Sequence, residues 1–161
     1  MSGNTYEIRL ETVGEVPLAV IDEQAHAQNI GPRIMSASSR LYPKLRELGI
    51  KGLGKDVVVY HPGNEKSWHE PPGIAIEVGV QLQEPLTHES APVRPSRTPS
   101  GRVATTLHRG PYQGLPQAHM AIHGYCEQHG LALGGRNWEV YDQHDPADPD
   151  KLETRVYYEL A

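Results

Sequence analysis

The residues best suited to chemistry in this chain surround Glu139, a carboxylate set between aromatic residues in the segment Asn137-Trp138-Glu139-Val140-Tyr141. Aromatic rings supply apolar contact area and attract cations, and a desolvated carboxylate supplies the complementary charge. Upstream, the run LHRGPYQGL from Leu107 to Leu115 predicts a strand followed by a tight Gly-Pro helix start. Together the two segments indicate a binding site for a cationic or polarised aromatic molecule more strongly than they indicate a reaction.

Strand alternation assigns further residues to this site. Along the expected last strand, Val156, Tyr158 and Leu160 share one face, and we expect Trp138 to join them, because helices need an apolar sheet face to cover. The opposite face is then predicted to gather the ligand-binding candidates, and the catalytic ones if the protein is an enzyme: Glu139, Tyr141, Tyr157, Glu159 and, from the first half of the chain, Glu77.

Two alternatives and one further candidate remain at this point. Glu and Tyr also occur on solvated faces of open sheets, so each of these residues has a purely structural explanation. Tyr112, at the first turn of the second helix, is a further ligand-binding candidate. Trp68, in the Pro-rich loop over residues 65–72, is either a lid over the cleft or an anchor for that loop.

Histidines raise the question of a metal site. His119 and His123 lie four residues apart in the expected second helix, which places both imidazoles on one face. The residues between them include no general-base glutamate, and no third ligand is evident. We therefore expect solvent-facing histidines, no metal and no cofactor, and we expect His108 to order the strand-to-helix turn.

Composition limits the classes of partner and of reaction. A formal net charge of −5 over 161 residues argues against the basic face that nucleic-acid binding needs. Cys126 is the only cysteine, so an internal disulfide is excluded and a reducing cytoplasm is expected. No apolar run approaches membrane-spanning length. Nucleophilic catalysis has little support, because Gly-x-Ser-x-Gly is absent and Cys126 falls on the apolar side of its helix.

The same order of elements is expected twice. Each half is predicted to contain a strand, a helix that begins at a Gly-Pro pair and ends at a glycine, and two more strands. In the first half these are a kinked strand over 6–21, a helix from Gly31-Pro32 to Gly49, and strands over 56–61 and 73–82. In the second half they are a strand over 102–108, a helix from Pro111 to about His129 with Gly130 after it, and strands over 138–142 and 152–160. We thus expect module 1 over about residues 5–83, an exposed Pro-rich linker over about 84–100 and module 2 over about 101–161.

The chain resembles the GyrI-like, or AraC-type effector-binding, small-molecule-binding domains over nearly its whole length. The resemblance rests on Val16-Pro17-Leu18-Ala19-Val20, on His108-Arg109-Gly110-Pro111-Tyr112 with Leu115, on Trp138-Glu139-Val140-Tyr141 and on the closing segment 155–160. It implies an α+β fold in which two pseudo-twofold related β-α-β-β modules form a mainly antiparallel sheet, with helices on one face and a central ligand cleft. It also implies that Glu139 is the family's buried ligand-binding glutamate and that Tyr112 belongs to its Gly-Pro-Tyr motif. Many relatives join this domain to a DNA-binding helix-turn-helix, whereas this chain begins with the first strand, so we expect no direct nucleic-acid binding.

Three functions follow from these expectations. The first in rank is stand-alone binding of amphipathic aromatic molecules, cationic ones included, as in drug or toxin sensing or sequestration. The second is hydrolysis of strained or electrophilic toxins such as cyclopropanoids, with Glu139 and either Glu77 or Glu159 as a carboxylate pair. The third is a protein-interaction role, as a gyrase-protecting protein or the detached sensor of a regulator, with a protein partner or a homodimer.

Overall fold

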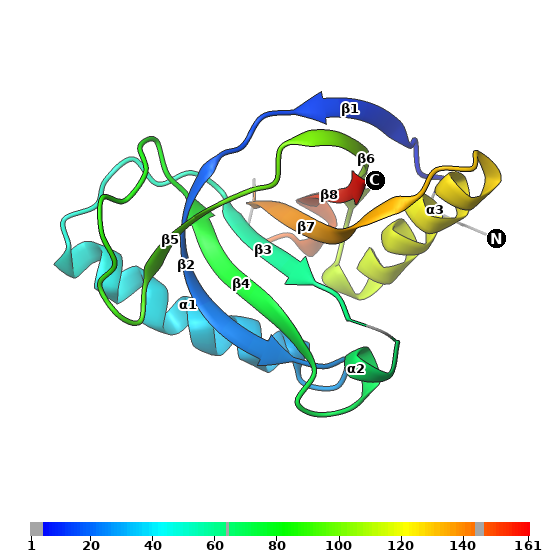
Figure 1. Cartoon of the computed structure of the whole chain (residues 1–161). Coiled ribbons are helices and arrows are strands. Elements are labelled where there is room, and N and C mark those ends of the chain that lie inside the picture. Colours follow the sequence, from blue (N-terminus) through cyan, green and yellow to red (C-terminus); the bar gives the residue numbers. More distant parts are fainter. Residues whose placement is uncertain (1–4, 64, 144–146) are drawn as a thin grey trace. The chain divides into compact units, whose positions relative to one another are not determined.

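The computed structural model describes residues 5–63, 65–143 and 147–161. The fold is α+β, as predicted, and the chain divides into two compact units (Figure 1). The first unit comprises Gly14–Pro99, and the second comprises Met1–Val13 together with Ser100–Ala161. Within the described residues, no helix combines the length and the apolar composition needed to cross a bilayer.

The first unit is an antiparallel sheet with one long helix against it. Its strands follow the order β3-β4-β2-β5, and α1 packs on β2 and β4. Its elements are β2 (Pro17–Ala25), α1 (Ile30–Glu47), β3 (Asp56–His61), α2 (Glu65–His69), β4 (Ile74–Gln81) and β5 (Arg94–Arg97). Side chains of α1 bond to Glu23 and Asp56, which lie directly opposite Ile76 and Val80 in the sheet. The α1-facing side is therefore the alternating Ile/Val face of β4, and Glu77 lies on the other side.

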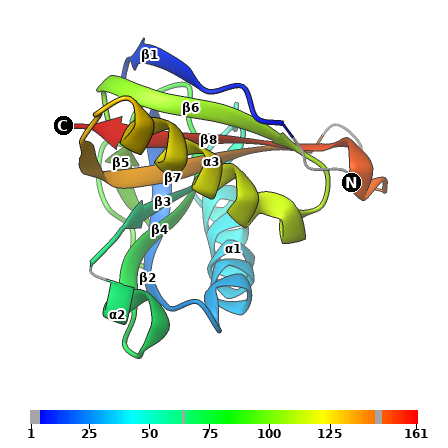
Figure 2. The same ribbon diagram turned by 90° about the vertical axis from the view of Figure 1, so that its right-hand side faces the viewer.

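The second unit repeats this arrangement. Its strands follow the order β1-β6-β8-β7, all antiparallel, and Figure 2 shows α3 running across the strands of its own unit. Its elements are β1 (Arg9–Val13), β6 (Gly101–Arg109), the 3-10 turn η1 (Tyr112–Gly114), α3 (Leu115–Gln128), β7 (Leu133–Gln143), the 3-10 turn η2 (Pro149–Lys151) and β8 (Leu152–Leu160). Its core consists of Ala104, Leu115, Ala118, Ile122, Cys126, Val156 and Tyr158.

The duplication extends to the glycines that end the helices. Gly49 and Gly130 follow α1 and α3 and have φ values of 71° and 65°, the left-handed conformation that glycine adopts without steric penalty. Both ends agree with the sequence pattern. The strands β2, β3 and β4 also have the same neighbours in their sheet as β6, β7 and β8 have in theirs.

Two expectations about the strands were wrong. The single kinked strand over 6–21 is two strands: β1 pairs with β6 in the second unit, whereas β2 belongs to the first unit. The segment over 84–100 is not simply an exposed linker, because it contains β5, which pairs with β2 and is flanked by the buried residues Val93 and Thr98. Each unit thus takes its edge strand from the segment that precedes the other unit's first strand. A local pattern cannot reveal such a pairing, because the partners are distant in sequence.

Candidate functional site

Glu139 is buried between β7 and α3 in the second unit. Its side chain is 4% exposed, and it lies directly opposite Val156 of the α3-covered core. His119 of α3 donates a hydrogen bond from Nε2 to Glu139 Oε2 at 2.6 Å, and the Tyr141 hydroxyl donates to Glu139 Oε1. Both carboxylate oxygens therefore accept a hydrogen bond from a side chain of the same unit.

A second layer of aromatic residues holds His119. Its Nδ1 lies 2.6 Å from the Tyr158 hydroxyl, and the two rings meet edge-on with centroids 5.5 Å apart. His123, one turn further along α3, contacts the same tyrosine edge-on at 4.9 Å. Burial, and then the charge of Glu139, raises the pKa of Tyr158, so this phenol stays protonated well above neutral pH. Partial burial, and then the neighbouring His119, lowers the pKa of His123.

Tyr112 forms the exposed end of this group. It is 40% exposed and meets Tyr141 edge-on, with ring centroids 5.7 Å apart. The turn that carries Tyr112 is ordered by His108, which is 1% exposed and donates from Nε2 to the Pro111 carbonyl at 2.9 Å. The Tyr6 hydroxyl lies 2.8 Å from the other ring nitrogen of His108, so both nitrogens of this imidazole have a hydrogen-bond partner. His108 thus has the ordering role expected from the sequence.

Thr154 adds a buried hydroxyl next to these phenols. It lies directly opposite both Tyr141 on β7 and His108 on β6, so it shares their sheet face. The residue is 0% exposed, and its Oγ1 has no hydrogen-bond partner among the described residues.

The structure brings Glu139, Tyr141 and Tyr112 together, but the predicted shared face with Tyr157 and Glu159 was wrong. Directly paired residues of antiparallel strands point to the same side, and Tyr157 pairs with Trp138 rather than with Glu139. The rings of Trp138 and Tyr157 stack at 4.9 Å with an interplanar angle of 8°. Glu159 forms an ion pair with Arg136 at 2.7 Å. Trp138 was placed with Val156 because it is apolar, yet α3 covers the face that carries Glu139.

The expectation of solvent-facing histidines was wrong for one of the pair, because His123 is exposed but His119 is not. The His119 side chain is only 21% exposed and bonds to the central carboxylate, so it does not face solvent. His119 and Tyr158 are the site residues that the sequence analysis missed. The four-residue spacing on one helix face was the available signal, but it was considered only for a metal. Among residues 5–63, 65–143 and 147–161, no three His, Cys, Asp or Glu side chains are grouped so that they could hold a metal ion.

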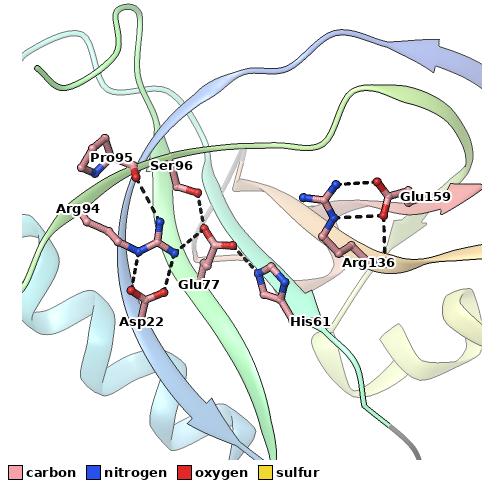
Figure 3. A network of polar contacts seen from close by, with 8 residues as sticks. All are labelled: Asp22, His61, Glu77, Arg94, Pro95, Ser96, Arg136 and Glu159. Atoms are coloured by element: carbon pink, nitrogen blue, oxygen red, sulfur yellow. Dashed lines mark hydrogen bonds and ion pairs between the residues drawn. The ribbon is translucent and has the colours of Figure 1, made fainter.

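Glu77 belongs to the first unit, where it has its own polar network (Figure 3). Its side chain is 8% exposed and accepts bonds from His61 Nε2 at 2.5 Å and from the Ser96 hydroxyl, with Arg94 at 3.3 Å. Arg94 also binds both oxygens of Asp22, at 2.6 and 2.8 Å. Burial alone would raise the pKa of Glu77, but the hydrogen bonds from His61 and Ser96 and the neighbouring positive charges outweigh burial and lower it.

One further feature belongs to each unit. Trp68 is a half-buried residue of α2 in the first unit, and its carbonyl accepts a bond from the Ala27 amide at 2.7 Å. In the second unit, a surface depression of about 330 Å³ is lined by Arg109, Asp150, Lys151, Leu152 and Glu153. It contains none of the residues around Glu139.

Several solved structures have a similar fold over nearly the whole of this chain. The C-terminal domain of EcmrR has a TM-score of 0.73 at 16% identity, covering 97% of this chain and 98% of that one. A hydrolase from Listeria innocua has a TM-score of 0.66 at 14% identity, covering 96% and 92%. SAV2435 bound to tetraphenylphosphonium has a TM-score of 0.59 at 15% identity, covering 96% and 94%.

Sequence comparisons are more specific about the family. No curated protein sequence matches this chain. The family of GyrI-like small molecule binding domains, however, matches residues 6–161, which is essentially the whole chain. The chain therefore belongs to the GyrI-like small molecule binding domain family.

Proposed function

We propose that this protein binds amphipathic aromatic cations at Glu139, with Tyr112 and Tyr141 providing the aromatic contacts. The observation that carries the proposal is the burial of the Glu139 side chain, 4% exposed, among phenol and imidazole groups. Tyr112 is exposed enough to contact a ligand from solution. It meets Tyr141 edge-on, and the hydroxyl of Tyr141 bonds to the carboxylate of Glu139. A guest with a delocalised positive charge would satisfy both the rings and the acid.

Desolvation explains why the charge of Glu139 matters. Removing a carboxylate from water costs several kcal/mol, and a positive guest placed beside it recovers part of that cost in a low-dielectric setting. The hydroxyl of Thr154, which has no hydrogen-bond partner among the described residues, offers a further polar contact on the same sheet face. A neutral aromatic guest would use the rings but would gain nothing from the acid, so the site should prefer cations.

The comparisons support this choice of ligand class. The chain belongs to a family of small molecule binding domains, and a solved structure with the same fold, SAV2435, is described as bound to tetraphenylphosphonium. That compound combines a permanent positive charge with four aromatic rings, which matches the chemistry around Glu139. Sequestration or sensing of such cationic compounds is the role we propose for this protein.

The experiment compares two glutamates on opposite faces of the second unit's sheet. Tetraphenylphosphonium is titrated by calorimetry into the wild-type protein, Glu139→Gln and Glu159→Gln. Removing one partner of a buried charge pair costs about 2–5 kcal/mol, so Glu139→Gln should weaken binding by roughly 30-fold or more. Glu159 is paired with Arg136 on the other face, so Glu159→Gln should leave the affinity unchanged within about twofold. An unaffected Glu139→Gln variant, or a loss seen only in Glu159→Gln, would refute the assignment.

Hydrolysis is the second candidate, and the contact between His119 and Glu139 is the observation that favours it. A carboxylate and an imidazole 2.6 Å apart could hold and polarise a water molecule for attack on a strained electrophile. The pairing of Glu139 with Glu159 cannot supply this chemistry, because the two lie on opposite faces. Incubation with a cyclopropane-bearing alkylator, followed by mass spectrometry, separates the outcomes: multiple turnovers support hydrolysis, and stoichiometric capture rejects it.

A further inference from the structure

We propose that His119 sets the charge selectivity of the Glu139 site, so that cation binding weakens when the imidazole gains a proton. A neutral His119 leaves the negative charge of Glu139 available to a cationic guest, whereas a protonated His119 cancels it from within the protein. This inference rests on the proposed function, because it concerns the same ligand class at the same carboxylate.

The hydrogen bonds of His119 permit both protonation states in one geometry. Nε2 donates to Glu139 at 2.6 Å in either state, since the carboxylate can only accept. Nδ1 faces the Tyr158 hydroxyl, also at 2.6 Å. A phenol hydroxyl can donate to a bare Nδ1 or accept from a protonated one, so the ring gains or loses its proton without leaving its place. The site's charge therefore changes while its shape stays the same.

The groups that face His119 come from three elements. Glu139 of β7 and Tyr158 of β8 bond to its two nitrogens, and His123 of α3 contacts the same Tyr158 ring edge-on. The pKa of Tyr158 is raised, so the phenol does not become an anion at neutral pH, and the pKa of His123 is lowered, which disfavours a second cation beside His119. His119 is also 21% exposed while Glu139 is 4% exposed, so protons in solution reach the imidazole.

The predicted consequence is a pH-dependent affinity for a permanent cation. Imidazole groups change charge between about pH 5 and 8. Tetraphenylphosphonium carries the same charge throughout, so a change in its affinity reports on the protein. Two unit charges several ångströms apart at an effective dielectric constant of about 20 repel enough to weaken binding about tenfold at the acid end. The neutral analogue triphenylphosphine oxide should show no such trend.

Two histidine variants on the same helix form a matched pair. His119→Gln keeps an N–H donor for Glu139 but cannot titrate, so its tetraphenylphosphonium affinity should be constant with pH. His123→Gln removes the neighbouring imidazole, which meets Tyr158 edge-on, and should retain the wild-type trend. Thermal melts followed by circular dichroism show whether both variants are folded.

A measurement on the wild-type protein tests the same coupling by following the effect of ligand binding on the protonation of His119. Long-range ¹H–¹⁵N NMR spectra follow the protonation of each imidazole. Because linkage is reciprocal, saturation with tetraphenylphosphonium should reduce the fraction of His119 that is protonated at a given acidic pH. This readout does not depend on any variant being folded.

The outcomes separate this inference from the proposed function. Tetraphenylphosphonium binding that is independent of pH, or a His119 titration that the ligand does not move, would overturn the inference and leave the proposed function standing. Loss of the trend in His123→Gln rather than in His119→Gln would also overturn it. Absence of tetraphenylphosphonium binding at every pH would overturn both.

Discussion

Replacing Arg94 with methionine tests whether the buried Glu77 network holds β5 onto the first unit's sheet. Arg94 lies on β5, and its guanidinium reaches Asp22 of β2 and Glu77 of β4 (Figure 3). Methionine retains much of the apolar stem of arginine and removes the charge. The expected result is a lower free energy of unfolding, because a buried carboxylate loses its guanidinium.

The size of the loss follows from the two contacts of Arg94. The Asp22 side chain is 57% exposed, so its ion pair is screened by water and contributes at most about 1 kcal/mol. The Glu77 side chain is 8% exposed, and leaving a buried polar group short of a partner costs about 1–3 kcal/mol. His61 and Ser96 remain bonded to Glu77, which places this second contribution near the low end. We expect a total loss of about 2 kcal/mol.

Urea unfolding of four proteins, followed by circular dichroism at pH 7, provides the assay. These are the wild type, Arg94→Met, Glu77→Gln and the double variant. Residues in one hydrogen-bonded network couple by about 0.5–3 kcal/mol, so the double variant should lose less stability than the sum of the single ones. Arg97→Met is the control on the same strand: its pair with Glu15 is 65% and 51% exposed, so its removal should change stability by at most about 0.5 kcal/mol.

The pH dependence of unfolding in the same proteins shows whether the charge of Glu77 stabilises the fold. The pKa of Glu77 is lowered in the folded protein, so its stabilising contribution is present above its unfolded pKa and disappears as the pH falls through its folded pKa. The stability difference between wild type and Glu77→Gln should therefore shrink between about pH 5 and 3. Additive losses in the double variant, or a difference that does not vary over this range, would show that Arg94 and Glu77 do not act as a pair.

Two further predictions concern packing. His108→Leu should destabilise the protein by about 2–3 kcal/mol in urea unfolding, because the ring is 1% exposed and both its nitrogens are bonded; a loss under about 0.5 kcal/mol would show that the turn does not depend on it. Gly79→Ala should destabilise or prevent folding, since an added Cβ would lie 2.4 Å from the Ala19 carbonyl oxygen. Gly124→Ala is its counterpart within α3, where an added Cβ meets no atom within 4 Å, and it should raise stability by about 0.5–1 kcal/mol. Equal effects of the two glycine substitutions would contradict the packing argument.

Local chemistry in the sequence determined a large part of the fold. The glycines after α1 and α3 adopt the left-handed conformation that commonly ends a helix, and the tolerance of that conformation is a property of glycine itself. The alternation from Ile74 to Val80 assigned Glu77 to the face away from α1, because one side of that strand is uniformly aliphatic. The His-Arg-Gly-Pro-Tyr and Trp-Glu-Val-Tyr segments also identified Tyr112, Tyr141 and Glu139 as neighbours, and the contacts of these residues agree.

The tertiary structure alone decided which way Glu139 points and what it meets. Trp138 and Val140 are apolar, but so are parts of both faces of β7. Hydrophobicity alone therefore did not determine which alternate residues of that strand face α3. The pairing of Glu139 with Val156 settles it, and that register depends on contacts between strands rather than on either strand's composition. The same holds for His119, whose role appears only when α3 lies over β7, and for β1 and β5, whose partners are far away in the sequence. Pairwise contacts between distant segments carry this information, and no local pattern of residues contains it.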